Sequence, residues 1–98
     1  MDSTVTIEEL KNSVRKFCEE RDWDQYHGAK DLAIGVITEA SELLECFRFK
    51  SPEEADLLFK DDKKRLEIEE EMADVLYFLL RLSQKYEIPL ATALNKIR

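Results

Sequence analysis

Apolar residues recur along most of the chain at the three- and four-residue spacing of an α-helix. This spacing predicts a first helix whose apolar face runs from Ile7 to Cys18 and fades at residues 22–23. Thr6 is followed three positions later by Glu9, the spacing of a capping box, in which each side chain binds the backbone N–H of the other residue. The first helix is therefore expected to begin directly after Thr6.

The same pattern predicts further helices, separated by short connections. No segment alternates between apolar and polar residues with turn residues at both ends, and the chain contains only two glycines and two prolines. The sequence thus predicts an all-α antiparallel bundle. After a loop at residues 22–29, the helices are expected from about Lys30 to Phe47 or Phe49, from the cap Ser51 to about Phe59, from about Lys63 to Tyr86, and over Leu90–Ile97.

Length and charge narrow the possible partners. The 98 residues are expected to form a single domain, 1–98, whose small core would benefit from burial against a partner subunit. The 22 acidic residues exceed the 15 Lys and Arg residues, which gives a net charge of −7. This excess argues against binding to nucleic acid or to an anionic membrane surface, both of which attract basic faces. The longest apolar run, Val75–Leu80, is far too short to span a bilayer.

The first residues and the cysteines indicate a cytoplasmic protein. The N-terminal segment MDSTVTIEEL is polar and acidic, unlike a signal peptide. Cys18 and Cys46 lie far apart and have no metal-ligand spacing, so we expect two reduced thiols.

Acidic residues fall at corresponding places on two predicted helices. On a helical wheel, Glu39 lies close to the apolar face of its helix, and Glu42 follows on the neighbouring strip. Glu71 points into the apolar face of the long helix, and Asp74 follows it at the same three-residue spacing. If the two helices pack antiparallel, four carboxylates meet.

Such a cluster of negative charges favours a bound cation. At about 4 Å and an effective dielectric constant near 20, each like-charged pair costs on the order of 4 kcal/mol. Oxygen ligands alone favour Mg²⁺, with Mn²⁺ as a substitute. A ferritin-type di-iron site needs Glu-x-x-His on two helices, whereas the one histidine, His27, lies in a loop. The alternative is that the four acids are solvated helix faces.

Three segments together resemble the MazG-like all-α nucleoside triphosphate pyrophosphohydrolases, and among them the small dCTP pyrophosphatase branch. The resemblance covers nearly the whole chain. It lies in residues 22–27 (DWDQYH), residues 32–50 with their EASELLE motif, and residues 70–76 (EEMADVL).

The resemblance implies a four-helix bundle completed by oligomerisation, as a dimer or a tetramer built of dimers. Glu39, Glu42, Glu71 and Asp74 match the magnesium-binding acids of the family, and Glu39 and Glu42 are the expected catalytic residues. The expected substrate-binding positions are Trp23, His27 and Phe49 around the base and sugar, and Lys30, Asn95 and Lys96 toward the phosphates. Ala29 and Asp31 replace a frequent Pro and Asn of the family.

The resemblance also implies an activity. We expect Mg²⁺-dependent hydrolysis of (d)NTPs, with dCTP-like substrates preferred, to a nucleoside monophosphate and pyrophosphate, in sanitation of the nucleotide pool. Two alternatives stay open at this point. One is a non-enzymatic acidic helical dimerisation module, and the other is a related phosphoribosyl-ATP or dUTP hydrolase.

Overall fold

The computed structural model describes residues 1–97, and Arg98 lies outside the described part. Over residues 1–97 the chain forms helices and no strand, which confirms the all-α prediction. In chain order the elements are α1 (Ile7–Glu20), the 3-10 turn η1 (Asp24–Tyr26), α2 (Ala29–Glu45), α3 (Pro52–Leu58), α4 (Asp62–Lys85) and α5 (Leu90–Ile97).

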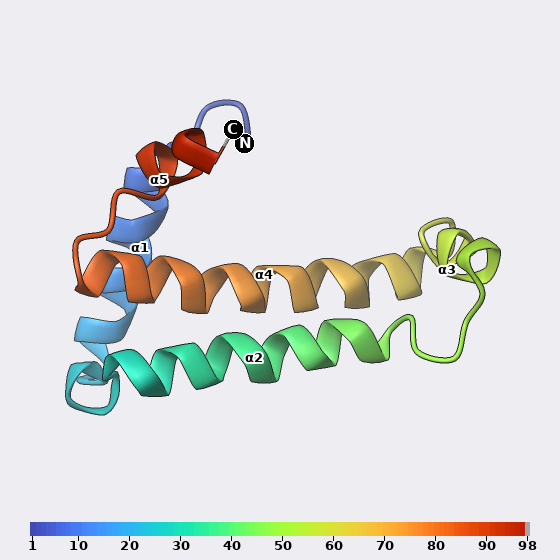
Figure 1. Ribbon diagram of the computed structural model, residues 1–98, viewed down its shortest axis with the longest axis horizontal. Helices are drawn as coiled ribbons and strands as arrows, with labels where there is room; N and C mark the ends of the chain where they lie inside the picture. The colour runs from blue at the N-terminus through green and yellow to red at the C-terminus, as the bar shows by residue number, and fades with distance from the viewer. Residues whose placement is uncertain (98) are drawn as a thin grey trace.

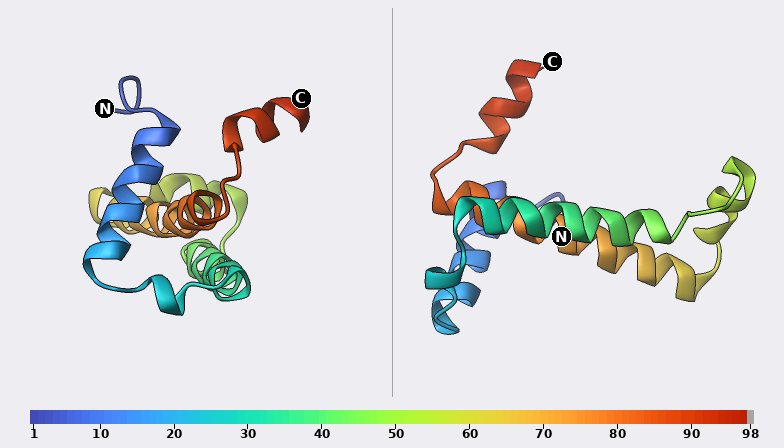
Figure 2. Two further views of the ribbon diagram at one scale, coloured as in Figure 1. Left: turned by 90° about the vertical axis from the view of Figure 1, so that its left-hand side faces the viewer. Right: turned by 60° about the horizontal axis from the view of Figure 1, so that its bottom comes forward.

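Helices α2 and α4 form the centre of the molecule. They run antiparallel and side by side along most of the length of α2 (Figures 1 and 2). Each of the two helices contributes buried apolar side chains, Leu32 from α2 and Ile68 and Leu80 from α4. These residues lie within the two apolar-patterned segments that the sequence predicts to be long helices.

Helix α1 crosses the C-terminal half of α4, while the short α3 lies at the opposite end of the α2–α4 pair (Figure 1). At the crossing, Cys18 is fully buried, and its Sγ lies 3.1 Å from the hydroxyl oxygen of Tyr77. Because α1 packs across α4 and not alongside it, α2 and α4 are the two helices of this chain that lie parallel to a common bundle axis.

The starts of the helices follow the capping signals in the sequence. At α1, the N–H of Glu9 donates to Thr6 Oγ1 at 3.1 Å, and the N–H of Thr6 donates to Glu9 Oε1 at 3.2 Å. A second capping box, between Ser51 and Glu54, starts α3 with Pro52 in its first turn. The local sequence thus determines where these helices begin.

The ends of the three longest helices are less regular. Asp22, Phe49 and Glu87 follow α1, α2 and α4, and each adopts a left-handed conformation, with φ between 54° and 64°. Such residues stop a helix and reverse the chain. The predicted end of the second helix at Phe47 or Phe49 is therefore late by two to four residues, since α2 ends at Glu45 and a turn at residues 46–49 leads to α3.

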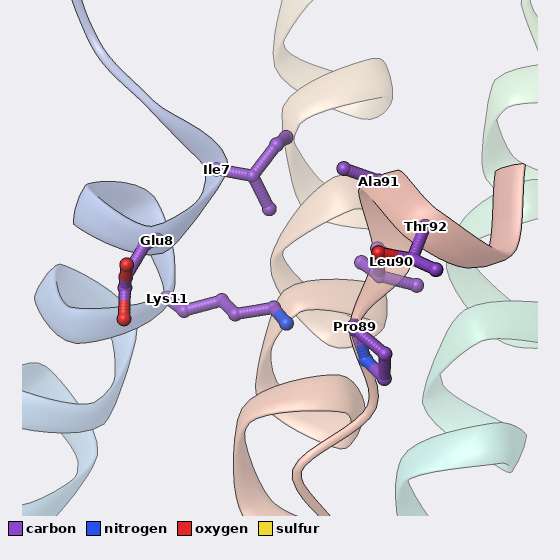
Figure 3. A pocket seen from close by; sticks show the side chains of 7 residues that line it. All are labelled: Ile7, Glu8, Lys11, Pro89, Leu90, Ala91 and Thr92. Carbon is purple, nitrogen blue, oxygen red and sulfur yellow. The ribbon is translucent and has the colours of Figure 1, made fainter. Parts of the chain in front are cut away.

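The first turns of α1 and α5 lie on either side of a cavity of about 300 Å³ (Figure 3). Lys11 of α1 extends toward the chain between α4 and α5, and its ammonium group donates to the carbonyl oxygen of Ile88. This contact ties α1 to the start of α5. Among the described residues, no helix is both long enough and apolar enough to cross a membrane.

Candidate active site

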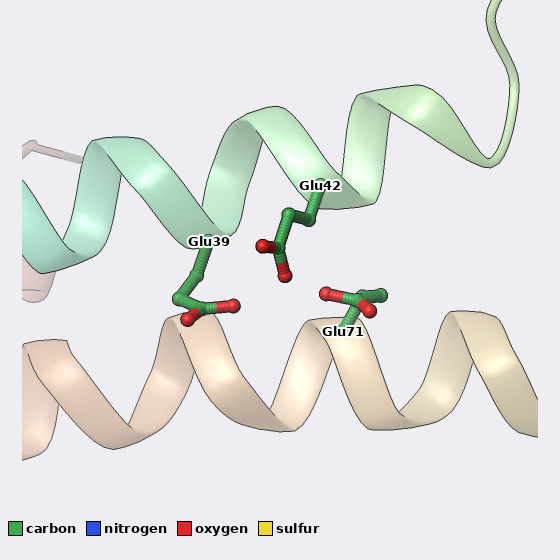
Figure 4. Close-up of side chains that lie close together, drawn as sticks. All are labelled: Glu39, Glu42 and Glu71. Carbon is green, nitrogen blue, oxygen red and sulfur yellow. The ribbon is translucent and has the colours of Figure 1, made fainter.

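Three carboxylates meet in the middle of the α2–α4 pair. Glu39 and Glu42 extend from α2 toward α4, and Glu71 extends from α4 toward them (Figure 4). One carboxylate oxygen of each residue lies within 4.8 Å of the others. Three of the four acids that the sequence pattern is expected to bring together therefore offer oxygen atoms to one small volume.

Two oxygens of this cluster have no partner within the protein. Glu39 and Glu71 are half-buried, and the Oε2 atom of each is buried without a hydrogen bond to any described residue. A buried carboxylate oxygen without a partner is destabilising unless a cation or a proton accompanies it. An oxygen-only set of this kind fits Mg²⁺ or Mn²⁺.

The carboxylates also influence one another electrostatically. Burial raises the pKa of Glu39, and the neighbouring Glu42 raises it further. Burial likewise raises the pKa of Glu71, with Glu42 again the next cause. Asp74 contributes through its charge to both shifts, but its carboxylate is not among the three that meet within 4.8 Å. The cluster is therefore a site of concentrated negative charge, with Asp74 at its edge.

A second group of polar side chains lies at the end of the pair where α2 begins. The ring of Trp23 stands edge-on to the ring of His27, with 6.0 Å between their centres. Arg81, near the C-terminal end of α4, is buried and donates from Nε to His27 Nδ1 at 3.1 Å. Its guanidinium also forms an ion pair with Asp24. These contacts fasten the turn at residues 24–27 to α4.

Comparisons with known proteins relate the chain to pyrophosphatases, although no protein-family model matches it. The chain is 33% identical to dCTP pyrophosphatase 1 of Rattus norvegicus and 31% identical to that of Homo sapiens, each over 88 residues. Either match covers 90% of this chain but 52% of the relative, so the chain spans about half the length of these relatives.

A solved structure is similar over more of its own length. A pyrophosphatase from Archaeoglobus fulgidus superposes with a TM-score of 0.84 and is 37% identical, over 92% of this chain and 82% of that one. The chain belongs to the MazG-like nucleoside triphosphate pyrophosphatases. The resemblance inferred from the acidic motifs is thereby confirmed.

In the folded MazG-like chain, the three residues that the resemblance places around one base and sugar do not lie together. Trp23 and His27 precede α2, whereas Phe49 follows it, and the 17 residues of α2 span about 25 Å. Phe49 is 92% exposed. One copy of the chain thus does not bring Phe49 to Trp23 and His27.

The predicted phosphate-contacting residues are also spread out. Lys30 is exposed in the first turn of α2, three positions after His27. Asn95 and Lys96 are exposed on α5, and Asn95 lines a cavity of about 400 Å³ that also borders Ile7 of α1. In the single chain Asn95 therefore shares a cavity with the first residue of α1.

Sequence reasoning missed the part that Arg81 and Asp24 play in the site. Arg81 is only 1% exposed, although in the sequence it merely interrupts an apolar run. A charged residue inside such a run is a signal that sequence reasoning could have used, because a buried guanidinium needs hydrogen-bond acceptors. Here two of its acceptors lie in the turn before α2, and the third is Gln84 of α4.

Proposed function

We propose that this chain is a Mg²⁺-dependent nucleoside triphosphate pyrophosphohydrolase that converts (d)NTPs to a nucleoside monophosphate and pyrophosphate. The observation that supports it most directly is the meeting of Glu39, Glu42 and Glu71 with two buried, unpaired oxygens. Relatives named dCTP pyrophosphatase 1 support a dCTP-like substrate. A role in nucleotide-pool sanitation is part of the proposal. The cytoplasmic location expected from the sequence belongs to the same proposal.

Four residues would hold the divalent cation: Glu39, Glu42, Glu71 and Asp74. Bound there, Mg²⁺ or Mn²⁺ would neutralise charge on the triphosphate and allow a polyanion to approach an acidic protein. Glu39 would orient a water molecule toward the α-phosphorus and accept its proton. The new bond joins the water oxygen to the α-phosphorus. The bond from the α-phosphorus to the α–β bridging oxygen breaks, and pyrophosphate leaves.

The proposed nucleoside end of the site is the Trp23–His27 pair. In the proposal, the two rings contact the base and sugar, and Lys30, Asn95 and Lys96 contact the phosphates. Glu39 lies ten positions after Ala29 along α2, which corresponds to about 15 Å, so the Trp23–His27 pair and the carboxylates would contact different parts of an extended ligand.

The proposal includes a homo-oligomer, as a dimer or a tetramer built of dimers. On α2, Ile37 is 71% and Leu44 62% exposed, and on α4, Met72 is 54% exposed. Apolar side chains at helical spacing on both long helices favour association with further helices, which would complete a four-helix bundle. A second copy would also offer a Phe49 to the Trp23–His27 pair of the first.

Product analysis tests the activity. The protein is incubated with each dNTP, with dUTP and with phosphoribosyl-ATP, in Mg²⁺ and in EDTA, and the products are separated by ion exchange. The proposal predicts monophosphate and pyrophosphate, with dCTP turned over fastest and no turnover in EDTA. Release of orthophosphate and a diphosphate, or no turnover of any nucleotide, would contradict the proposal. A preference for dUTP or for phosphoribosyl-ATP would contradict the dCTP-like specificity and favour the related hydrolase.

Substitutions test whether turnover depends on the carboxylates of the acid cluster or only on the overall negative charge of the protein. We expect Glu39→Gln and Glu71→Gln to abolish turnover, because each removes a cation-binding carboxylate at nearly constant shape. Glu20→Gln on α1 is the matched control, since Glu20 is exposed and lies outside the cluster. Equal activity of all three variants would show that the cluster is not the catalytic centre.

A further inference from the structure

Arg81 is a buried cation, and two of its three side-chain contacts reach the turn before α2. Its Nε donates to His27 Nδ1 at 3.1 Å, one terminal nitrogen donates to Gln84 Oε1 at 2.7 Å, and the other pairs with the carboxylate of Asp24. The side chain is 1% exposed. An arginine in this position remains charged and can only donate hydrogen bonds.

The donor from Arg81 determines where the histidine carries its proton. Because Nδ1 of His27 accepts a hydrogen bond, that nitrogen has no proton, and the neutral ring must be protonated on Nε2. Protonation of Nδ1 would set an N–H against the N–H of Arg81 and a second positive charge against the guanidinium. The Arg81 contact therefore favours a single tautomer and the neutral ring.

The charges around His27 act in the same direction. Burial lowers the pKa of His27, and the nearby cations Arg81 and Lys85 lower it further, against the opposing charges of Asp24 and Asp31. Its ordinary value is 6.5. His27 thus stays neutral to a lower pH than a solvent-exposed histidine.

We propose that Arg81 is a positioning residue, which holds His27 as the neutral tautomer protonated on Nε2 and so gives the nucleoside end of the site a fixed N–H donor. The ligand chemistry that fits this donor is a neutral acceptor on the base or sugar, such as a carbonyl oxygen or a ring nitrogen. The assignment of the tautomer stands on the Arg81 contact alone, whereas its use in binding rests on the proposed function.

A comparison with neighbouring Lys85 distinguishes the positioning of the His27 ring from simple attachment of the turn to α4. Its ammonium group donates to the carbonyl oxygens of Asp24 and of His27, and so ties the backbone of the turn to α4. Arg81, in contrast, directs one N–H at the imidazole ring itself. Two cations one helical turn apart therefore hold the same segment, and one of them also contacts the ring.

Nitrogen-15 NMR of the histidine side chain tests the tautomer. His27 is the chain's one histidine, so the labelled ring needs no assignment. The native protein should show an unprotonated Nδ1 and a protonated Nε2, with a titration midpoint below 6.5. A protonated Nδ1 or an even mixture of tautomers would overturn the proposal, whether or not any variant folds.

Two substitutions of the same kind on α4 complete this test. Arg81→Gln should raise the midpoint toward the ordinary value and allow a mixture of tautomers. Lys85→Gln is the matched control, since it removes a cation that contacts the same turn but not the ring, and it should keep the Nε2–H tautomer. If both variants change the tautomer equally, Arg81 only fastens the turn and the proposal is wrong.

Kinetics with dCTP and Mg²⁺ test whether the donor is used. Loss of one hydrogen bond predicts a KM about 2- to 10-fold higher in Arg81→Gln, with kcat within about twofold of native. His27→Gln, which keeps an N–H donor near the Nε2 position, should retain a lower KM than His27→Ala. An altered tautomer with an unchanged KM would overturn the role in binding. Absence of any turnover by the native protein would overturn the proposed function and leave the tautomer to be decided by NMR.

Discussion

Gly35 of α2 and Phe78 of α4 are in such close contact that a β-carbon at position 35 would lie 2.5 Å from two atoms of the phenyl ring. Glycine is therefore the residue that lets the two helices approach at this point. Glu39 lies one helical turn beyond Gly35, and Asp74 one turn before Phe78, so the contact sits beside the acid cluster and sets the local separation of the helices that form it.

We predict that Gly35→Ala destabilises the protein, although alanine is the better helix former by about 1 kcal/mol. The added methyl group collides with a large, half-buried ring, and overpacking of this kind costs about 1–3 kcal/mol. Chemical denaturation measures the change. In a Phe78→Leu background the same substitution should cost less, and an equal cost in both backgrounds would contradict the contact as its cause.

Divalent cations should stabilise the native protein through the acid cluster. A cation that binds the folded state at 100 times its Kd adds about 2.7 kcal/mol to the free energy of unfolding. We expect Mg²⁺ to raise the Tm of the native protein and to leave the Tm of Glu71→Gln nearly unchanged. If Mg²⁺ does not alter the native Tm, the cluster does not bind it, which would favour the non-enzymatic dimerisation module.

Without metal, stability should fall as the pH rises. The folded-state pKa of Glu39 is raised above its ordinary 4.5 by burial and by Glu42. Its contribution to stability is thus complete below about pH 4.5 and is lost as the pH rises through the folded-state value. Denaturation in EDTA should show the native protein losing stability relative to Glu39→Gln across this interval. A difference that does not vary with pH would contradict the shifted pKa.

Asp24 should produce the opposite dependence. The hydrogen bond from Arg81 lowers the pKa of Asp24 below its ordinary 3.8. Its stabilising contribution is present above that value and is lost as the pH falls through the folded-state pKa. We expect Asp24→Asn to be less stable than the native protein near neutral pH and to converge with it in strong acid. Parallel acid-denaturation curves would contradict the prediction.

Activity should require residues from two copies of the chain. His27→Ala and Phe49→Ala are each expected to weaken turnover, because Phe49 lies at the far end of α2 from His27. Mixing the two variants after partial unfolding and refolding should recover part of the activity, since one site of a mixed dimer would be intact. Failure to recover any, with mixed oligomers demonstrated by mass spectrometry, would place both residues outside a shared site.

The sequence predicted those features that depend on neighbouring residues along the chain. Apolar spacing predicted the helices, and the Thr6–Glu9 capping box and the cap Ser51 predicted where two of them begin. The convergence of Glu39 with Glu71 was also predictable, since two acids near apolar faces meet once their helices pack.

Other features depend on contacts that residue spacing does not specify. The bond between Arg81 and His27 spans 54 positions and requires the turn before α2 to fold back against α4. Phe49 itself adopts the left-handed conformation after α2. This conformation could not be predicted from the sequence, because the residue is not a glycine. The positions of Asn95 and Lys96 depend on the direction α5 takes after Pro89, which is a property of the connection and not of the helix.

The left-handed conformations of Asp22, Phe49 and Glu87 have a consequence for engineering. Both glycines of the chain have negative φ, so each of these reversals is made by a residue whose β-carbon disfavours it. A glycine at such a position would remove a steric cost of about 1–2 kcal/mol from the folded state. Part of this gain in the free energy of unfolding would be offset, because glycine also gives the unfolded chain more conformational entropy. Asp22 and Glu87 are exposed and lie outside the acid cluster, so these two surface substitutions could raise the thermal stability of the protein while leaving Glu39, Glu42 and Glu71 in place.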